Sequence, residues 1–356
     1  MTSEVADLLQ KVSLATLEAH RGNLDAAREA ISDIRSTYAI ERMPDVSAEV
    51  MIAEGICEAY SGNLDAGFDR FRRAALVAHH FGSQPVEQLA LSWLAHCEFN
   101  RGNPLESVKH IGQAHRSIEN ARPDARFRIA STIAVLCEYA GMTEPASNWF
   151  GVARREASRC GERAMMSSIV FNMATMRIGS AIVSQLQGQP DSTPTSSRTN
   201  SLVVESSANY DKIAKVHVQG ETSELLAAQN LMANGEYGAS LAILDRIVVN
   251  SGDLAPVDIA RARFSRAWCC FRSDLYFTDA GDLIESLNEF SDDDDLAFAY
   301  AVLSKVCRQE NDLMESERQR AISLHHLNNF VLTQRLIEND LAAEGLCDVP
   351  EIWAER

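Results

Sequence analysis

Apolar residues recur every three to four positions along most of the chain, with polar residues between them. This period predicts amphipathic α-helices, because it places the apolar side chains on one helical face. The pattern predicts about eight consecutive helix pairs. The first helices of the pairs are expected near residues 3–20, 46–60, 85–100, 124–140, 162–178, 221–234, 255–272 and 293–309. The second helices are expected near 23–39, 63–81, 104–119, 143–159, 203–217, 236–250, 275–290 and 311–328, and a capping helix near 330–344.

A short glycine motif separates the two helices of a pair. It reads RGNLDA at 21–26, SGNLDA at 61–66 and RGNPLE at 101–106, and weaker copies begin at Gly141 and Gly235. Glycine readily adopts the left-handed conformation that closes a helix, so each motif glycine is predicted to be a C-cap. The Asn or Asp beside it is predicted to cap the second helix.

The predicted second helices share their packing positions. A small residue stands five positions after the motif glycine, a large apolar residue nine positions after it, and a further apolar residue twelve positions after it. These offsets fall on one helical face, where the small residue lets two helices approach closely. In chain order the three sets are Ala27, Gly67, Ser107, Ala146 and Ser240; Ile31, Phe71, Ile111, Phe150 and Leu244; and Ile34, Ala74, Ala114, Ala153 and Ile247.

This pattern resembles the tetratricopeptide repeat, in which small and large residues follow the turn glycine at these offsets. Small residues also stand seven positions before the glycine, at Gly55, Ala95, Ala134 and Ala228. The period of about 40 residues exceeds the usual period of roughly 34 and is similar to a longer-helix variant found in bacterial signalling and regulatory proteins. The resemblance implies an all-α fold, a right-handed α-α superhelix that acts as a non-catalytic interaction module.

In proteins of this resemblance, ligands lie in a concave groove lined by the first helices. Such a groove binds a peptide, a protein helix or a partner domain. Asn and Arg side chains there can hold a peptide backbone or a carboxylate, and Tyr supplies contact area. Each residue also has a plainer interpretation as a packing or solvated side chain. The groove positions are Tyr60, His96, Phe99, Asn100, Arg128 and Tyr139.

A Cys-Glu pair recurs at matching positions before three of the turns. Its glutamates are Glu58, Glu98 and Glu138. Stacked repeats would bring them into one row. In one interpretation nearby arginines such as Arg21 and Arg101 neutralise the row, or the carboxylates simply face water. In the other, the row is an acidic stripe in the groove for a basic or amine-bearing ligand.

Charge divides the chain unevenly. Residues 1–180 carry 19 basic and 22 acidic side chains, net −3, whereas residues 181–356 carry 14 and 28, net −14. The polar, turn-forming segment 188–201 lies at the change and is predicted to be a flexible surface loop or, alternatively, a tether near the groove. We therefore expect N-terminal repeats at 1–178, an insert at 179–202 and acidic repeats at 203–356.

Composition and motifs narrow the functional classes. The formal charge of −17 argues against nucleic acid and anionic membranes as partners. The stretch Ile169–Leu186 is interpreted as too polar for a membrane span. The N-terminus lacks a signal-peptide pattern, and the eight cysteines show no C-x-x-C, so a cytoplasmic protein with reduced buried cysteines is expected.

The sequence carries no recognisable catalytic or phosphate-binding motif. The adjacent pairs His79-His80 and His325-His326 are poorly arranged to chelate, and Asp292–Asp295 fits a helix N-cap better than a calcium loop, so no metal or cofactor is expected. Two rivals to the interaction module remain: an α/α-toroid enzyme, which the low aromatic content of 7% disfavours, and a self-assembling scaffold, in which the chain forms a homo-oligomer.

Overall fold

The computed structural model describes residues 3–116, 118–188, 194–214, 220–250 and 254–353. Within these ranges the regular structure comprises sixteen α-helices and four short 3-10 helices, so the chain is all-α as predicted. Helix packing divides the chain into two units. Unit 1 comprises Met1–Ile169, Tyr210–Val218 and Leu336–Arg356, and unit 2 comprises Val170–Asn209 and Gln219–Arg335.

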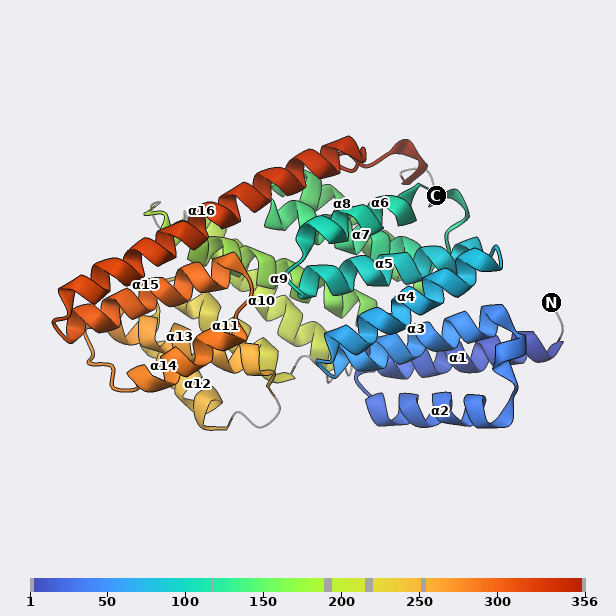
Figure 1. Ribbon diagram of the computed structural model, residues 1–356, viewed down its shortest axis with the longest axis horizontal. Coiled ribbons are helices and arrows are strands. Elements are labelled where there is room, and N and C mark those ends of the chain that lie inside the picture. The colour runs from blue at the N-terminus through green and yellow to red at the C-terminus, as the bar shows by residue number, and fades with distance from the viewer. Residues whose placement is uncertain (1–2, 117, 189–193, 215–219, 251–253, 354–356) are drawn as a thin grey trace. The chain divides into compact units, whose positions relative to one another are not determined.

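Unit 1 is built from four successive helix pairs (Figure 1). The two helices of each pair pack against each other, and the first helices α1, α3, α5 and α7 also stack on one another in chain order. This arrangement is consistent with a helical repeat. The helices are α1 (Ser3–Arg21), α2 (Leu24–Thr37), α3 (Pro44–Tyr60), α4 (Leu64–His80), α5 (Gln84–Asn100), α6 (Pro104–His115), α7 (Pro123–Tyr139) and α8 (Thr143–Cys160).

The motif glycines close the first helices as predicted. Gly22, Gly62, Gly102, Gly141 and Gly235 all have φ between 76° and 88°. An L-residue with a Cβ pays a steric cost in this region, which explains the choice of glycine. At each turn the next backbone N–H donates to the carbonyl five residues earlier, as in the 2.9 Å bond from Asn23 N to Glu18 O. The turns therefore satisfy carbonyls that the ending helix leaves open.

The predicted Asn caps form only in part. Asn63 Oδ1 accepts a long 3.4 Å bond from Ala66 N at the start of α4, whereas the side chains of Asn23 and Asn103 make no capping bond. The prediction was wrong for these two, whose amide groups donate backwards to a glutamate of the preceding helix. Asn23 Nδ2 lies 2.6 Å from Glu18 Oε2, and Asn103 Nδ2 lies 2.9 Å from Glu98 Oε2.

The repeated packing positions are all buried, as the offsets predicted. The closest approach is between α3 and α4. A Cβ atom built on Gly55 would lie 2.6 Å from Phe71 Cε1, and one on Gly67 would lie 3.0 Å from the Gly55 carbonyl oxygen. Phe71 stacks in turn on Trp93 of α5, at 5.3 Å between ring centroids. Small residues thus set the spacing that brings aromatic rings of neighbouring repeats together.

Unit 2 also has sequential pair contacts. α11 packs on α12, α12 on α13, and α13 on α14 and α15, and the side chain of Ser323 on α16 donates to the Ala297 carbonyl of α15 at 2.7 Å. Its core gathers around Phe264, Trp268 and Phe298. The helices of the second half are α9 (Arg163–Leu186), α10 (Pro194–Ala214), α11 (Gly220–Ala233), α12 (Tyr237–Val249), α13 (Pro256–Arg272), α14 (Ala280–Ser286), α15 (Asp293–Gln309) and α16 (Leu313–Ala343), and the unit boundaries fall within α9, α10 and α16.

Three predicted elements differ in the structure. The helix expected at 275–290 is reduced to α14 and a 3-10 turn, because the preceding loop buries Phe277 and holds Asp279 in an ion pair with Arg266. The helices expected at 311–328 and 330–344 form the single helix α16, since neither Gly nor Pro interrupts the sequence between them.

Helical backbone also covers much of the predicted insert. α9 continues to Leu186 and α10 begins at Pro194, a residue compatible with a first helical turn. Residues 189–193 of the segment lie outside the described residues. The division at 179–202 stays a prediction.

Helix α9 meets the length and composition requirements of a membrane span, contrary to the expectation that its sequence is too polar. Its most apolar window has a mean hydropathy of 1.2 and is 28% buried inside the protein. Core helices of soluble proteins can have the same length and hydropathy. Ala174 and Ile178 of α9 are buried in a cluster with Val204 of α10 and Leu226 of α11.

Candidate functional site

Four first helices of unit 1 bring a set of aromatic and basic side chains together. We call this set the Arg128 cluster; it comprises His20, Tyr60, Trp93, His96 and Arg128, from α1, α3, α5 and α7. The Trp93 ring is its centre. It stacks on His20 at 5.9 Å and meets Tyr60 edge-on at 6.1 Å and His96 edge-on at 5.6 Å. The Arg128 Cζ atom lies 3.7 Å from the Trp93 centroid, a short cation–π distance.

Arg128 is buried, and the Arg128 cluster contains no acidic residue that could balance its charge. Only 4% of its surface is exposed. Burial lowers the pKa of Arg128, and the neighbouring Tyr60 opposes this effect. Among the described residues, the Arg128 Nε atom has no hydrogen-bond partner. A buried cation in this state has lost its hydration without gaining a compensating anion.

Both imidazoles of the cluster are neutral at physiological pH. Burial, and after it the charge of Arg128, lowers the pKa of His20 and of His96 to about 3. His20, Tyr60 and His96 each keep part of their surface in contact with solvent. Arg128 therefore supplies the positive charge of the cluster, and half-buried rings border it.

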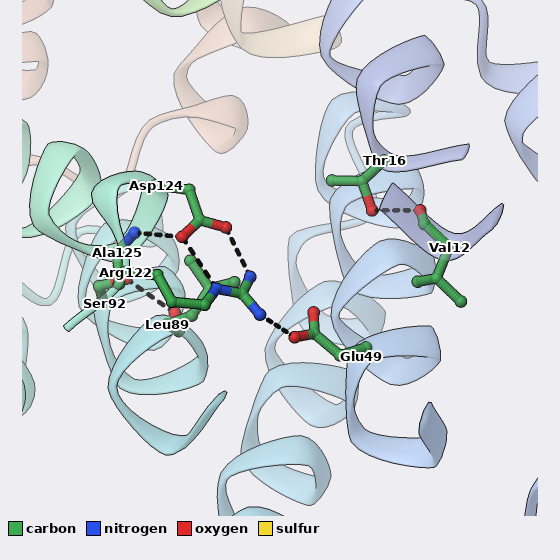
Figure 2. A network of polar contacts seen from close by, with 8 residues as sticks. All are labelled: Val12, Thr16, Glu49, Leu89, Ser92, Arg122, Asp124 and Ala125. Atoms are coloured by element: carbon green, nitrogen blue, oxygen red, sulfur yellow. Dashed lines mark hydrogen bonds and ion pairs between the residues drawn. The ribbon is translucent and has the colours of Figure 1, made fainter. Parts of the chain in front are cut away.

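Asp124, whose charge acts on the cluster, is bound by Arg122 and not by Arg128 (Figure 2). Asp124 opposes the lowering of the His20 pKa, but both of its carboxylate oxygens bond Arg122, at 3.1 and 2.5 Å. Arg122 also pairs with Glu49 of α3. Asp124 Oδ1 accepts a further bond of 2.9 Å from Ala125 N, at the start of α7. The Asp124 carboxylate is therefore already bound by Arg122 and by the backbone of Ala125.

The predicted groove residues fall into two groups. Tyr60, His96 and Arg128 belong to the Arg128 cluster, and Asn100 joins them because its Nδ2 lies 3.1 Å from His96 Nε2. Phe99 and Tyr139 form a separate edge-to-face pair between α5 and α7, at 5.4 Å between centroids. The first helices thus carry two separate groups of predicted residues: the Arg128 cluster with Asn100, and the Phe99–Tyr139 pair.

Two members of the cluster were missed from the sequence. His20 stands two positions before its turn glycine, as Tyr60 and Asn100 do before theirs, so the repeat register could have identified it. Trp93 gave no such signal, because the repeats before and after α5 have no aromatic residue at the equivalent position.

The recurring glutamates take part in the turns. Glu98 is buried, and its Oε2 accepts from Asn103 at 2.9 Å and pairs with Arg101 at 3.3 Å. Glu58 accepts from Asn63 at 3.3 Å. Glu138 lies at the matching position at the end of α7, where Met142 replaces the asparagine. These contacts give Glu58 and Glu98 a local structural partner, and a role in ligand binding stays a prediction.

The cysteines that precede these glutamates are buried thiols. Burial raises the pKa of Cys57 to about 11 and of Cys97 and Cys137 to about 12. Thiolate is the reactive form of cysteine, so these side chains are unreactive at neutral pH. The structure records all three as free cysteines.

Comparisons with protein-family models and with curated proteins find no match to this chain.

Proposed function

We propose that the chain is a non-catalytic interaction module, and that the first-helix face of unit 1 binds an anionic group of a peptide or protein at Arg128. The observation that carries the proposal is the burial of the Arg128 guanidinium with an unpartnered Nε. A carboxylate that reached Arg128 would supply the missing charge and hydrogen bonds, and charge-assisted bonds of this kind are strong.

The surroundings of Arg128 suit such a ligand. Trp93 lies against one face of the guanidinium, and Tyr60 is a polar neighbour that favours its charged form. Because His20 and His96 are neutral, they add hydrogen-bonding capacity without further charge. Asn100 is exposed beside His96 and is suited to hold a peptide backbone. Phe99 and Tyr139 would supply apolar contact area.

The repeat architecture supports a broader proposal. The stacked pairs of unit 1 fit a right-handed, tetratricopeptide-like solenoid, and such solenoids use extended surfaces for recognition. We place the protein in bacterial regulation or signalling in the cytoplasm, with a protein or peptide partner rather than nucleic acid or membrane.

A peptide-binding screen tests the site. Immobilised decapeptides of random sequence are presented with either a free or an amidated C-terminus and are probed with the full chain. We expect bound peptides to require a free carboxylate or an acidic side chain. The Arg128→Gln variant should bind them at least about 30-fold more weakly, since loss of a buried charged contact costs about 2 kcal/mol or more.

Arg73→Gln is the matched control, because Arg73 lies on the second helix α4 and is exposed. It should bind like the wild type. Equal binding by the wild type and Arg128→Gln, with both chains folded, would contradict the proposal.

A further inference from the structure

The last described segment of the chain, residues 346–353, lies on unit 1 near α6 (Figure 1). It follows Gly345, whose φ of +69° ends helix α16. Two of its side chains are anchors: Leu346 is fully buried and Trp353 is 1% exposed. Between the anchors, Asp348 and Glu351 are exposed.

Three helices of unit 1 enclose the Trp353 ring. Its indole stacks on His115 of α6, at 6.1 Å with 8° between planes, and meets Trp149 of α8 edge-on at 5.4 Å. The Arg126 Cζ atom of α7 lies 4.3 Å from the indole. We call His115, Arg126 and Trp149 the indole cage.

Hydrogen bonds from side chains join the segment to these helices. Trp353 Nε1 donates to His115 Nε2 at 3.2 Å, and Trp149 Nε1 donates to the Leu346 carbonyl at 2.8 Å. Arg155 contributes a long 3.5 Å bond to the Trp353 carbonyl. The backbone N–H groups of Leu346 and Trp353, by contrast, donate to their own neighbours in the chain, the carbonyls of Leu341 and Pro350. Aromatic anchors combined with a few polar contacts are typical of a bound peptide.

We propose that residues 346–353 are a detachable ligand carried by the chain, and that the indole cage is a recognition site for this C-terminal segment, whether from the same chain or from a second copy. The backbone of the segment is not part of the helix pairs of unit 1. Its release therefore leaves the hydrogen bonds within α6, α7 and α8 intact. The site is distinct from the Arg128 cluster and does not depend on the function proposed for it.

The cage also makes the attachment sensitive to pH. The indole N–H requires His115 Nε2 as an acceptor, so His115 must be neutral in the attached state. Protonation would remove this acceptor and place a second positive charge beside Arg126. Burial, followed by the charge of Arg126, lowers the pKa of His115, and Glu344 opposes them.

The other charges around His115 are paired. Glu344 pairs with Arg116 at 2.9 Å, and Arg126 pairs with Glu156 at 3.3 Å. Arg159 binds the same Glu156 carboxylate at 2.6 Å. Because the attached state has the lower His115 pKa, attachment is strongest above about pH 6.5, the ordinary histidine value, and weakens as the pH falls below it.

A synthetic peptide tests the site in trans. The full chain with Leu346→Ala and Trp353→Ala retains the cage but loses both anchors of its own segment. A labelled peptide of residues 344–353 should bind this variant, measured by fluorescence anisotropy under reducing conditions, and should bind the wild type at least about 30-fold more weakly because the site is filled. A peptide with Trp353→Ala should be weaker by about 30-fold or more.

Binding of the peptide should also weaken as the pH falls from 7.5 to 5.5. Adding His115→Gln to the variant supplies an amide oxygen as the acceptor without a titrating group, and should remove this pH dependence. A folded double variant that does not bind the peptide would overturn the proposal.

Hydrogen exchange of the wild-type chain gives a second test that needs no substitution. Amides of residues 346–353 should open with a smaller free energy than those of α7 and α8, and the difference should grow at pH 5.5. Opening of the segment only together with α7 and α8 would show that it is part of the core and would equally overturn the proposal.

Discussion

The Arg128 guanidinium stacks on the Trp93 indole, with 3.7 Å between Cζ and the ring centroid, although the two residues belong to different repeats. The contact joins α7 to α5 at the centre of the Arg128 cluster. It places a buried charge where a hydrophobic residue would pack at no electrostatic cost. The stability of variants can therefore separate a functional from a structural role of Arg128.

Replacing Arg128 with Met should leave the free energy of unfolding unchanged or raise it by about 1–4 kcal/mol, because the change removes an uncompensated buried charge. Arg126→Met is the matched control two positions away. Arg126 is equally buried but pairs with Glu156, so its loss should cost about 3–5 kcal/mol. Urea unfolding at pH 7 measures the free energy of unfolding of both variants. Equal losses of this free energy would indicate that Arg128 stabilises the fold.

The two buried imidazoles of the cluster should weaken unit 1 in acid. The pKa of His20 and of His96 is about 3 in the folded chain, well below the usual 6.5. The unfolded chain therefore binds more protons in this interval, and each group lowers the free energy of unfolding by about 1.4 kcal/mol per pH unit as the pH falls from about 6.5 toward 3.

Nuclear magnetic resonance can check these pKa values directly. The Cε1–H resonances of His20 and His96 should stay constant between pH 8 and pH 5 in the folded chain and should titrate near pH 6.5 in 8 M urea. Titration of either folded imidazole in that range would show that the cluster is more open than the structure indicates.

The acidic start of α15 in unit 2 predicts an opposite pH effect. Burial, and after it the charges of Asp295 and Asp292, raises the pKa of Asp294 to about 7. The folded state holds a proton that the unfolded state releases, so this group destabilises unit 2 at pH 8 and ceases to do so as the pH falls toward 4. Asp294→Asn should raise the free energy of unfolding at pH 8.

Asp295→Asn is the matched control for that variant. Asp295 accepts three bonds from Arg261, at 2.8, 3.1 and 3.3 Å, so the substitution should lower the free energy of unfolding by about 1–3 kcal/mol at the same pH. Denaturation series at pH 8, 6 and 5 would compare the two. A stabilising Asp295→Asn would contradict the assigned pairing.

The close approach of α3 and α4 predicts the effect of an added methyl group. Gly55→Ala would place its Cβ against the buried Phe71 ring, which stacks on Trp93. Overpacking of this kind should lower the free energy of unfolding by about 1–3 kcal/mol and alter the Trp93 fluorescence.

Gly179→Ala offers the corresponding control within helix α9. A Cβ at this position meets no atom within 4 Å among the described residues, so it should instead stabilise the chain by about 0.5–1 kcal/mol through the helix propensity of alanine. Similar effects of the two substitutions on thermal unfolding would show that the Gly55 contact is not tight.

Local periodicity explains how much of the fold was predictable. The turn at Gly62 depends on the backbone freedom of one residue, and the burial of Phe71 depends on its offset within one helix. Both signals lie within a few residues of the feature they determine. The caps at Asn23 and Asn103 are exceptions: their amides donate to Glu18 and Glu98 and make no capping bond at the next helix.

The candidate site was predictable only in its repeated part. Tyr60 and His96 were found by counting back from the glycines, and His20 occupies a recurring position that the counting could have included. Trp93 occurs in one repeat only, so the period does not identify it. The difference between Arg128 and Arg126 depends on which acids lie within reach after the helices stack.

The sequence by itself determined most of the helices, the glycine turns and the faces that pack, since each follows from backbone geometry and from spacing along one or two helices. Tertiary structure alone decided which acids reach the buried arginines of α7 and what residues 346–353 contact. Trp353 donates to His115 across 238 positions of sequence, and the stacking of α1, α3, α5 and α7 buries Arg128 where no acid among the described residues pairs with it. Such contacts depend on distances between separate elements, which hydrophobic periodicity does not specify.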